Sequence, residues 1–313
     1  MTILLEARNL SRHYGATIAV QQINITVKRG EILGFLGPNG AGKSTTMNML
    51  SGNLAPSRGE IRINGFDLFS NPKAAKAQLG YLPETPPLYR ELTVSEYLYH
   101  CGRLNGLRGK PLKTAVDVVV EQCGLGDVSR RLIGQLSKGY QQRTGIAQAV
   151  VHRPAVVILD EPTSALDPVQ IRQIRELIRE IANEHSVILS THILPEVEML
   201  CDQVQIISKG EVVFADSLEA LHQKRRNNSL KVTMLNPPPI AMLSALPGVT
   251  AIEQLSAQQV RLHYTTENAP TQQLLAAAVN GQWQLQELIH EQDSLEDIFM
   301  ELINSEAKRR GQG

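Results

Sequence analysis

The sequence predicts an α/β domain followed by a smaller α+β domain, and two patterns support this fold class. Over residues 1–223, short apolar runs that suit buried parallel strands alternate with helical stretches. After a polar break at 224–229, β-like runs and helical stretches alternate again up to residue 303. We therefore predict one domain over 1–223 and a second over 230–303, with a polar tail at 304–313 that we expect to be mobile.

The composition narrows the classes of function. Lys plus Arg and Asp plus Glu number 31 each among 313 residues, so no net charge draws the chain to nucleic acid or anionic lipid. The three cysteines form no CxxC pair and fit a reducing compartment. No apolar run approaches the roughly 18 residues of a spanning helix, and the N-terminus does not resemble a signal peptide. We expect a chain that neither spans a membrane nor is exported by that route, which is compatible with docking on a membrane partner.

The first elements of the larger domain are predicted from alternation of apolar and polar residues. Strands are predicted at 3–10, 23–27, 32–36 and 59–65, and a helix-like run lies at 45–50. The strand at 32–36 and the helix at 45–50 flank a Gly-rich segment. A strand–loop–helix unit is therefore expected early in the domain.

A helical insert is predicted at about 85–150, within the α/β domain. Thr93 and Glu96 form a capping box that opens a helix through about Asn105, and 112–123 carries a second helical stripe. Ser137 is a candidate N-cap for a further amphipathic helix at 141–151.

The remaining elements of the larger domain return to a strand–helix alternation. The continuous apolar run at 155–159 suits a buried parallel strand. Asp167 and Pro168 are a helix cap and a first helical residue, and isoleucines then recur at helical spacing: Ile171, Ile174, Ile178 and Ile181. Strands are predicted at 187–190, 204–208 and 212–215.

The smaller domain has the pattern of a ferredoxin-like α+β module. β-like runs lie at 230–234, 249–255, 259–264 and 284–288, with helical stretches at 239–246 and 270–279 and a serine-capped helix at 294–303. The basic cluster at 224–226 fits a solvated linker, and contact with lipid headgroups is the alternative.

The Gly-rich segment 37–45 is a complete G-x-x-x-x-G-K-[ST] phosphate-binding loop in its proper context. It reads Gly37, Pro38, Asn39, Gly40, Ala41, Gly42, Lys43, Ser44 and Thr45. Its glycines let backbone N–H groups point inward at the positive end of a helix, which suits a pyrophosphate. Lys43 would reach the terminal phosphates, and the Ser44 hydroxyl would ligate Mg²⁺. A Gly-rich turn without a ligand is the alternative, and the complete motif favours a nucleoside triphosphate site.

Two carboxylates follow the buried strand at 155–159. Asp160 would hold the Mg²⁺ shell, and Glu161 would polarise an attacking water as general base. The alternative is an acidic turn after a core strand. The phosphate loop by itself leaves kinases, GTPases and motor ATPases open.

With these motifs in order, residues 3–215 resemble the ATP-binding subunits of ATP-binding-cassette (ABC) transporters. Residues 136–143 fall where that family has its Leu-Ser-Gly-Gly-Gln signature, with Ser137 and Gly139 intact. Residues 164–167, which end in Asp167, match the D-loop, and His192 matches the switch histidine. Tyr14 takes the place of the aromatic residue that stacks on adenine.

The resemblance implies an ATPase that works as a head-to-tail homodimer. In the family, the signature of one subunit (here Ser137 and Gly139, in trans) closes over the γ-phosphate held by the other subunit, so ATP and Mg²⁺ lie between two chains. It further implies an integral membrane permease as partner, a location on the cytoplasmic face of the membrane, and no nucleic acid. The substrate would bind the permease and not this chain.

Three positions in two motifs depart from the commonest family pattern. Lys138 and Tyr140 stand in the signature where Gly and Gln are usual. Glu84 stands where the Q-loop glutamine approaches Mg²⁺; its carboxylate could ligate the metal but adds negative charge beside the γ-phosphate.

These variants and the appended domain look like the branch that serves ABC-2-type exporters, including gliding-motility and multidrug-efflux subunits. A soluble ABC ATPase acting on nucleic acid or ribosomes is the alternative function. The single cassette, the neutral charge and the lack of a Cys/His ligand cluster argue against it. A metabolic kinase is disfavoured by the signature and by His192.

Overall fold

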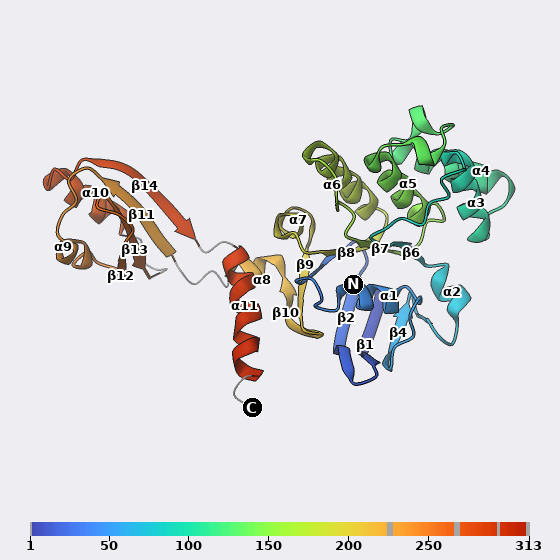
Figure 1. The fold of residues 1–313 in the computed structure, drawn as a ribbon, viewed down its shortest axis with the longest axis horizontal. Coiled ribbons are helices and arrows are strands. Elements are labelled where there is room, and N and C mark those ends of the chain that lie inside the picture. Colours follow the sequence, from blue (N-terminus) through green and yellow to red (C-terminus); the bar gives the residue numbers. More distant parts are fainter. Residues whose placement is uncertain (1, 224–227, 266–269, 293–294, 311–313) are drawn as a thin grey trace. The chain divides into compact units, whose positions relative to one another are not determined.

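The computed structural model describes residues 2–223, 228–265, 270–292 and 295–310. The chain divides into two compact units, Met1–Leu218 and Glu219–Gly313. The sequence places the boundary later, at 224–229, and residues 224–227 lie outside the described residues. Figure 1 labels the helices and strands of both units.

A six-stranded sheet forms the centre of the first unit, in the order β10-β9-β3-β8-β7-β6. Its strands are β3 (Ile32–Leu36), β6 (Leu79–Leu82), β7 (Val156–Asp160), β8 (Ser186–Thr191), β9 (Gln203–Ser208) and β10 (Glu211–Ser217). All neighbouring strands pair in parallel except β9 and β10. Every residue of β3, β7 and β8 is buried, as the continuous apolar runs predict for strands covered on both faces.

A second, antiparallel sheet has the order β2-β1-β4-β5. It consists of β1 (Ile3–Tyr14), β2 (Thr17–Lys28), β4 (Arg58–Ile63) and β5 (Phe66–Asp67). Strands β1 and β2 are longer than predicted, because they pair from Ile3 with Lys28 through to Tyr14 with Thr17. Buried side chains of this sheet and of β3, β7 and β8 belong to one core with Met47, Met49 and Leu50 of α1 (Lys43–Leu50).

Helices cover the central sheet from both sides. In Figure 1, α5 (Lys138–Val150) and α6 (Pro168–Ala182) lie on one side, and α1 with the antiparallel sheet lies on the other. The other helices of this unit are α2 (Pro72–Lys76), α3 (Val94–Leu104), α4 (Gly109–Gln122), α7 (Leu194–Leu200) and the 3₁₀ turns Gly126–Val128 and Ile133–Gln135. Helices α3, α4 and α5 lie within the range of the predicted helical insert, about 85–150.

Capping side chains fix where two of these helices begin. Thr93 accepts a hydrogen bond from the Glu96 backbone, and the Glu96 carboxylate accepts one from the Thr93 N–H at 2.9 Å, which is the predicted capping box. Ser137 caps α5, which therefore begins at Lys138, three residues before the predicted start at Gln141.

The second unit contains the β-α-β-β-α-β order of a ferredoxin-like module, as predicted. Its elements are β11 (Asn228–Met234), α9 (Ile240–Ser244), β12 (Val249–Gln254), β13 (Gln259–Tyr264), α10 (Thr271–Asn280) and β14 (Leu285–Gln292). The strands form one antiparallel sheet in the order β12-β13-β11-β14. Leu243 of α9 and Leu274 of α10 share a core with Leu262 and with Trp283, the single tryptophan.

Two further helices complete this part of the chain, α8 (Leu218–Gln223) and α11 (Leu295–Arg310). The predicted serine cap, Ser294, lies outside the described residues. Helix α11 continues past its predicted end at Ile303, because Glu, Ala, Lys and Arg in this segment all favour helix. The predicted mobility from Asn304 stays a prediction.

In the part of the chain that the structure describes, every helix is too short or too polar to cross a bilayer.

The capping box predicts a measurable contribution to the stability of α3. Thr93→Ala removes an acceptor for the Glu96 N–H, so we expect the free energy of unfolding to fall by about 1 kcal/mol. Thr93→Ser is the matched control, because it keeps the hydroxyl. Urea denaturation of the full chain measures both variants, and equal stability of Thr93→Ala and wild type would contradict this role for the cap.

Candidate active site

Three segments with predicted functional residues meet at one edge of the central sheet. Strands β3, β8 and β7 are parallel neighbours, so their carboxyl ends lie together. The phosphate loop follows β3, Glu161 follows β7, and His192 follows β8. Ligands of open α/β sheets bind at this edge.

The Lys43 ammonium is the positive charge of the site. Its side chain is only 6% exposed, and Nζ donates to the Gly37 carbonyl at 2.8 Å and to the Pro38 carbonyl at 3.4 Å. A Glu161 carboxylate oxygen lies 3.7 Å from the same nitrogen. The lysine therefore closes the loop onto itself and pairs with the predicted general base.

The glycines of the loop are required for different reasons. A Cβ on Gly37 would lie 2.4 Å from the Ile207 carbonyl oxygen, so the loop packs directly on the backbone at β9. Gly42 has a φ of 109° and its Cβ would lie 2.8 Å from the Ala19 carbonyl oxygen of β2. Gly40 has a φ of 77° in open space, so only its backbone conformation demands glycine.

Glu161 and His192 form the second pair of the site. His192 Nδ1 lies 2.8 Å from Glu161 Oε2, while Glu161 Oε1 faces Lys43. Glu161 is only 8% exposed and has a φ of 48°, a left-handed conformation that costs energy in a residue with a side chain. Its backbone N–H is held by the Ser190 carbonyl of β8 at 2.8 Å, which supports this conformation.

Asp160 ends β7 and lies beside this pair. It is 3% exposed, and its Oδ1 is buried without a hydrogen-bond partner. Burial raises the pKa of this carboxyl, and the charges of Glu161 and Glu84 add to the rise, while the nearby Ser190 hydroxyl and the Lys43 charge act in the opposite direction. A buried, unpartnered carboxylate oxygen is suited to a cation or to a water bound to one.

The other two predicted metal-site residues are accessible. Ser44, in the first turn of α1, is exposed, and so is Glu84, whose charge acts on Asp160. Among the described residues, no three His, Cys, Asp or Glu side chains gather as a metal site. This arrangement fits Mg²⁺ and its usual mode, in which one or two protein oxygens combine with substrate phosphates and water.

Tyr14 lies at the end of β1, where it pairs with Thr17 of β2. Because β2 continues into Ala19 against Gly42, this hairpin adjoins the phosphate loop. The Arg12 guanidinium lies 4.7 Å from the centre of the Tyr14 ring, held by a bond to the Ala55 carbonyl at 2.8 Å. The tyrosine is 48% exposed, which leaves ring surface for a base.

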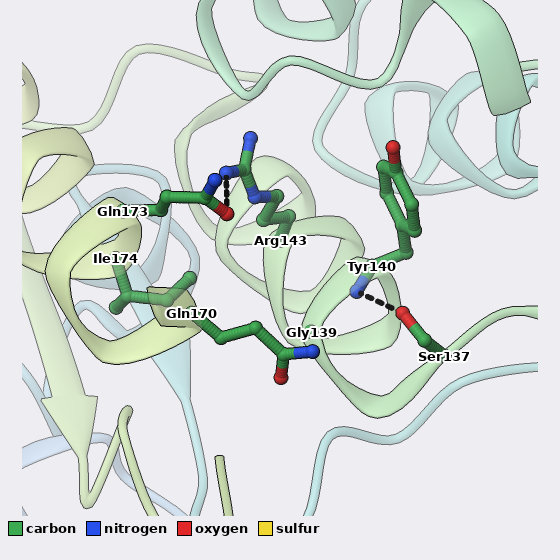
Figure 2. A pocket seen from close by; sticks show the side chains of 7 residues that line it. All are labelled: Ser137, Gly139, Tyr140, Arg143, Gln170, Gln173 and Ile174. Atoms are coloured by element: carbon green, nitrogen blue, oxygen red, sulfur yellow. Dashed lines mark hydrogen bonds between the residues drawn. The ribbon is translucent and has the colours of Figure 1, made fainter. Parts of the chain in front are cut away.

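The signature residues belong to a separate hollow between α5 and α6 (Figure 2). Its volume is about 250 Å³, and its lining consists of Ser137, Gly139, Tyr140, Arg143, Gln170, Gln173 and Ile174. None of the phosphate-loop residues lines it. The exposed Ser137 caps α5, so a hydroxyl and a helix N-terminus face solvent here.

The D-loop Asp167 has a structural partner in its own chain. Its carboxylate accepts from the Val169 and Gln170 N–H groups at 3.0 and 2.9 Å and caps α6. Ser164 and Leu166 line a second groove with Glu84 and Lys138. Nothing in these contacts tests the predicted role of Asp167 towards nucleotide.

Comparison with known proteins identifies the family to which the chain belongs. The family model described as ABC transporter matches residues 20–164, and the model described as ATP-binding protein DrrA1-3-like, C-terminal domain, matches residues 217–303. The bacitracin transport ATP-binding protein BcrA of Bacillus licheniformis is 40% identical over 72% of this chain and 73% of its own. The chain belongs to the ABC transporter family of ATP-binding proteins.

Other relatives extend the similarity over both units. The linearmycin resistance ATP-binding protein LnrL of Bacillus subtilis (strain 168) is 31% identical over 96% of this chain and 98% of its own. A solved ATP-binding subunit of an ABC transporter superposes with a TM-score of 0.65 and 34% identity, over 71% of this chain and 92% of its own. As a family member, the chain is an ATP-binding and ATP-hydrolysing subunit of an ABC transporter.

Sequence reasoning missed two residues that shape this ABC site, Gln170 and Glu196. Gln170 packs against the predicted Gly139, where a Cβ would lie 2.8 Å from the Gln170 side chain. Glu196 of α7 is fully buried and accepts hydrogen bonds from the Thr163 and Thr191 hydroxyls. No local pattern singles out Glu196, because the same short helix carries a second acidic residue, Glu198, which is exposed.

The burial of Asp160 predicts that this residue lowers the stability of the protein in a pH-dependent way. Because its folded pKa is raised, the ionised carboxylate destabilises the nucleotide-free protein at neutral pH. Asp160→Asn should therefore raise Tm, each 1 kcal/mol being worth roughly 2–4 °C. The gain should shrink as pH falls, and it should vanish below the unfolded pKa of about 3.9, where both states carry a neutral Asp160.

Thermal unfolding at about pH 7 and about pH 4 measures the change in this gain. Asp67→Asn is a control of opposite sign, because a backbone hydrogen bond from Ser70 lowers the pKa of that carboxyl and its ionised form is favoured by folding. A Tm gain for Asp160→Asn that does not change with pH would contradict the argument.

Proposed function

We propose that the chain hydrolyses ATP between two copies of itself and thereby drives a separate membrane permease of the exporter type. The observation that carries this proposal is the contact of Lys43, Glu161 and His192 at the carboxyl edge of the sheet. These three side chains supply a phosphate-binding cation, a base and a group that orients the base.

In the proposed reaction, the loop at 37–45 and Lys43 bind the phosphates, while Tyr14 stacks on adenine. Lys43 exchanges its carbonyl and Glu161 partners for phosphate oxygens, which releases one Glu161 oxygen. Glu161 then takes a proton from the water whose oxygen attacks the γ-phosphorus, and the bond to the β–γ bridging oxygen breaks to leave ADP. His192, bonded to the other Glu161 oxygen, holds the carboxylate in line.

A divalent cation would be held by Ser44 and Asp160, with Glu84 able to approach from the Q-loop position. Mg²⁺ would neutralise charge on the β- and γ-phosphates during transfer. The support for this assignment is the partnerless Oδ1 of Asp160. The Glu84 carboxylate adds a negative charge that a glutamine would lack.

We propose a head-to-tail dimer because the donors are divided between two places in the chain. The phosphate loop holds one anion cradle, and the hollow at Ser137 and Gly139 offers a second N-terminal anion site on α5. In the dimer, the second site of one chain completes the first site of the other, with Asp167 at the same interface. ATP then joins the two copies, and hydrolysis releases them.

The proposed partner is an integral membrane permease, and the proposed location is the cytoplasmic face of the membrane. The helical region 85–135, which contains α3 and α4, would carry the surface that receives the permease. The relatives named for bacitracin transport and linearmycin resistance, together with the DrrA-like domain, support the exporter assignment.

The proposal predicts a trapped state for Glu161→Gln. Without the base, we expect kcat for ATP hydrolysis to fall roughly 10²–10⁴-fold. ATP should still bind, so a persistent ATP-bound dimer should appear in size-exclusion chromatography. Glu121→Gln, on the exposed face of α4, is the matched control.

Two results would contradict the proposal. A Glu161→Gln chain that stays monomeric with ATP would remove the composite site. Undiminished hydrolysis by Lys43→Ala would remove the phosphate loop from the reaction.

A further inference from the structure

A buried carboxylate is bonded to two threonines that lie close in sequence to Glu161 and His192. Glu196, in α7, has no exposed surface. Its neighbours along the helix, Leu194, Val197 and Leu200, are buried apolar residues. Burying an ionised carboxylate is unfavourable unless partners compensate for the lost water.

Its compensating partners come from three different elements. The Thr163 hydroxyl donates to Glu196 Oε1, and the Thr191 hydroxyl donates to Oε2 at 2.8 Å. Arg175 of α6 lies 3.6 Å from Oε1. Each carboxylate oxygen therefore has a hydroxyl donor, and the arginine supplies a counter-charge.

The two threonines are close in sequence to the two residues of the pair. Thr163 is two positions after Glu161, and Thr191 immediately precedes His192. The Thr191 hydroxyl also accepts from the Ile193 N–H at 3.1 Å, so the chain is held on both sides of His192. Glu196 thus connects the segment that carries the base with the segment that carries the histidine.

We propose that Glu196 is a positioning residue for ATP hydrolysis, which fixes the separation of Glu161 and His192 through Thr163 and Thr191. This inference depends on the proposed roles of Glu161 and His192. The Glu196 clamp consists of three residues, Glu196, Thr163 and Thr191.

A role in holding Glu161 and His192 in place explains why position 196 carries a charged residue. An apolar side chain would suit a helix face lined by Leu194 and Val197, since buried ion pairs seldom stabilise more than well-packed apolar residues do. Glu161 keeps a left-handed φ of 48°, and such conformations persist where surrounding contacts over-determine them. The clamp provides contacts of this kind on both sides of the pair.

Isosteric variants test the clamp. Thr163→Val and Thr191→Val each remove one hydroxyl donor, and Glu196→Gln removes the charge. We expect kcat of the full chain to fall roughly 10- to 100-fold for each threonine variant, as for a small misplacement of catalytic groups. KM for ATP should stay within about twofold, because Lys43 and the phosphate loop are unchanged.

Ser186→Ala is the matched structural control. Ser186 is buried at the opposite end of β8, donates to the Lys28 carbonyl at 2.8 Å and accepts from the Gly30 N–H at 3.0 Å. Its loss should lower Tm about as much as Thr191→Val does but leave kcat near wild type. Thr191→Ser, which keeps the donor, should restore kcat.

A background variant separates positioning from general damage. In a His192→Ala chain, Thr191→Val should cost far less than in wild type, because the geometry it protects is already lost. Wild-type kcat in both threonine variants, or equal losses in Thr191→Val and Ser186→Ala, would overturn the clamp. Full activity in Glu161→Gln and His192→Ala would instead overturn the proposed roles on which it depends.

Discussion

The burial of the Lys43 ammonium beside the Glu161 carboxylate is the interaction around which the site is organised. Both side chains are largely removed from water, and the lysine is held by the Gly37 carbonyl of its own loop. Two buried charges are tolerated only when each has good partners. Glu161 meets that condition through His192 on its other oxygen, and the strands β3, β7 and β8 bring all of these groups to one edge.

The same charges explain why the site is prepared for a nucleotide. Asp160 is buried with an unpartnered oxygen and a raised pKa, so its ionised form is unfavourable in the folded chain. Phosphate oxygens would replace the carbonyls that now hold Lys43, and a cation would satisfy Asp160. Binding of nucleotide and cation would thus provide partners for the charges of both Lys43 and Asp160. The positions that carry out the chemistry therefore lower the stability of the protein in the absence of substrate.

Much of the fold and of the active site could be predicted from the sequence, where a motif or a local spacing specifies the residue. The phosphate loop and the Asp160–Glu161 pair follow directly from a motif and a buried strand, and the capping residues Thr93 and Ser137 were recognised by spacing. The contacts of Glu196 and Gln170 were not predictable, because they join elements that are distant in sequence. Likewise, the steric need for Gly37 depends on the backbone at β9, which no local pattern reveals.

In the proposed dimer, the phosphate loop of one chain works with Ser137 of another, and mixing two inactive chains tests this most directly. The Lys43→Ala chain loses the first anion site. The Ser137→Asp chain keeps the cap of α5 but places a negative charge in the second anion site. A mixed dimer would contain one intact composite site, so the mixture should hydrolyse ATP faster than the sum of its parts. A mixture no more active than the separate chains would contradict the account.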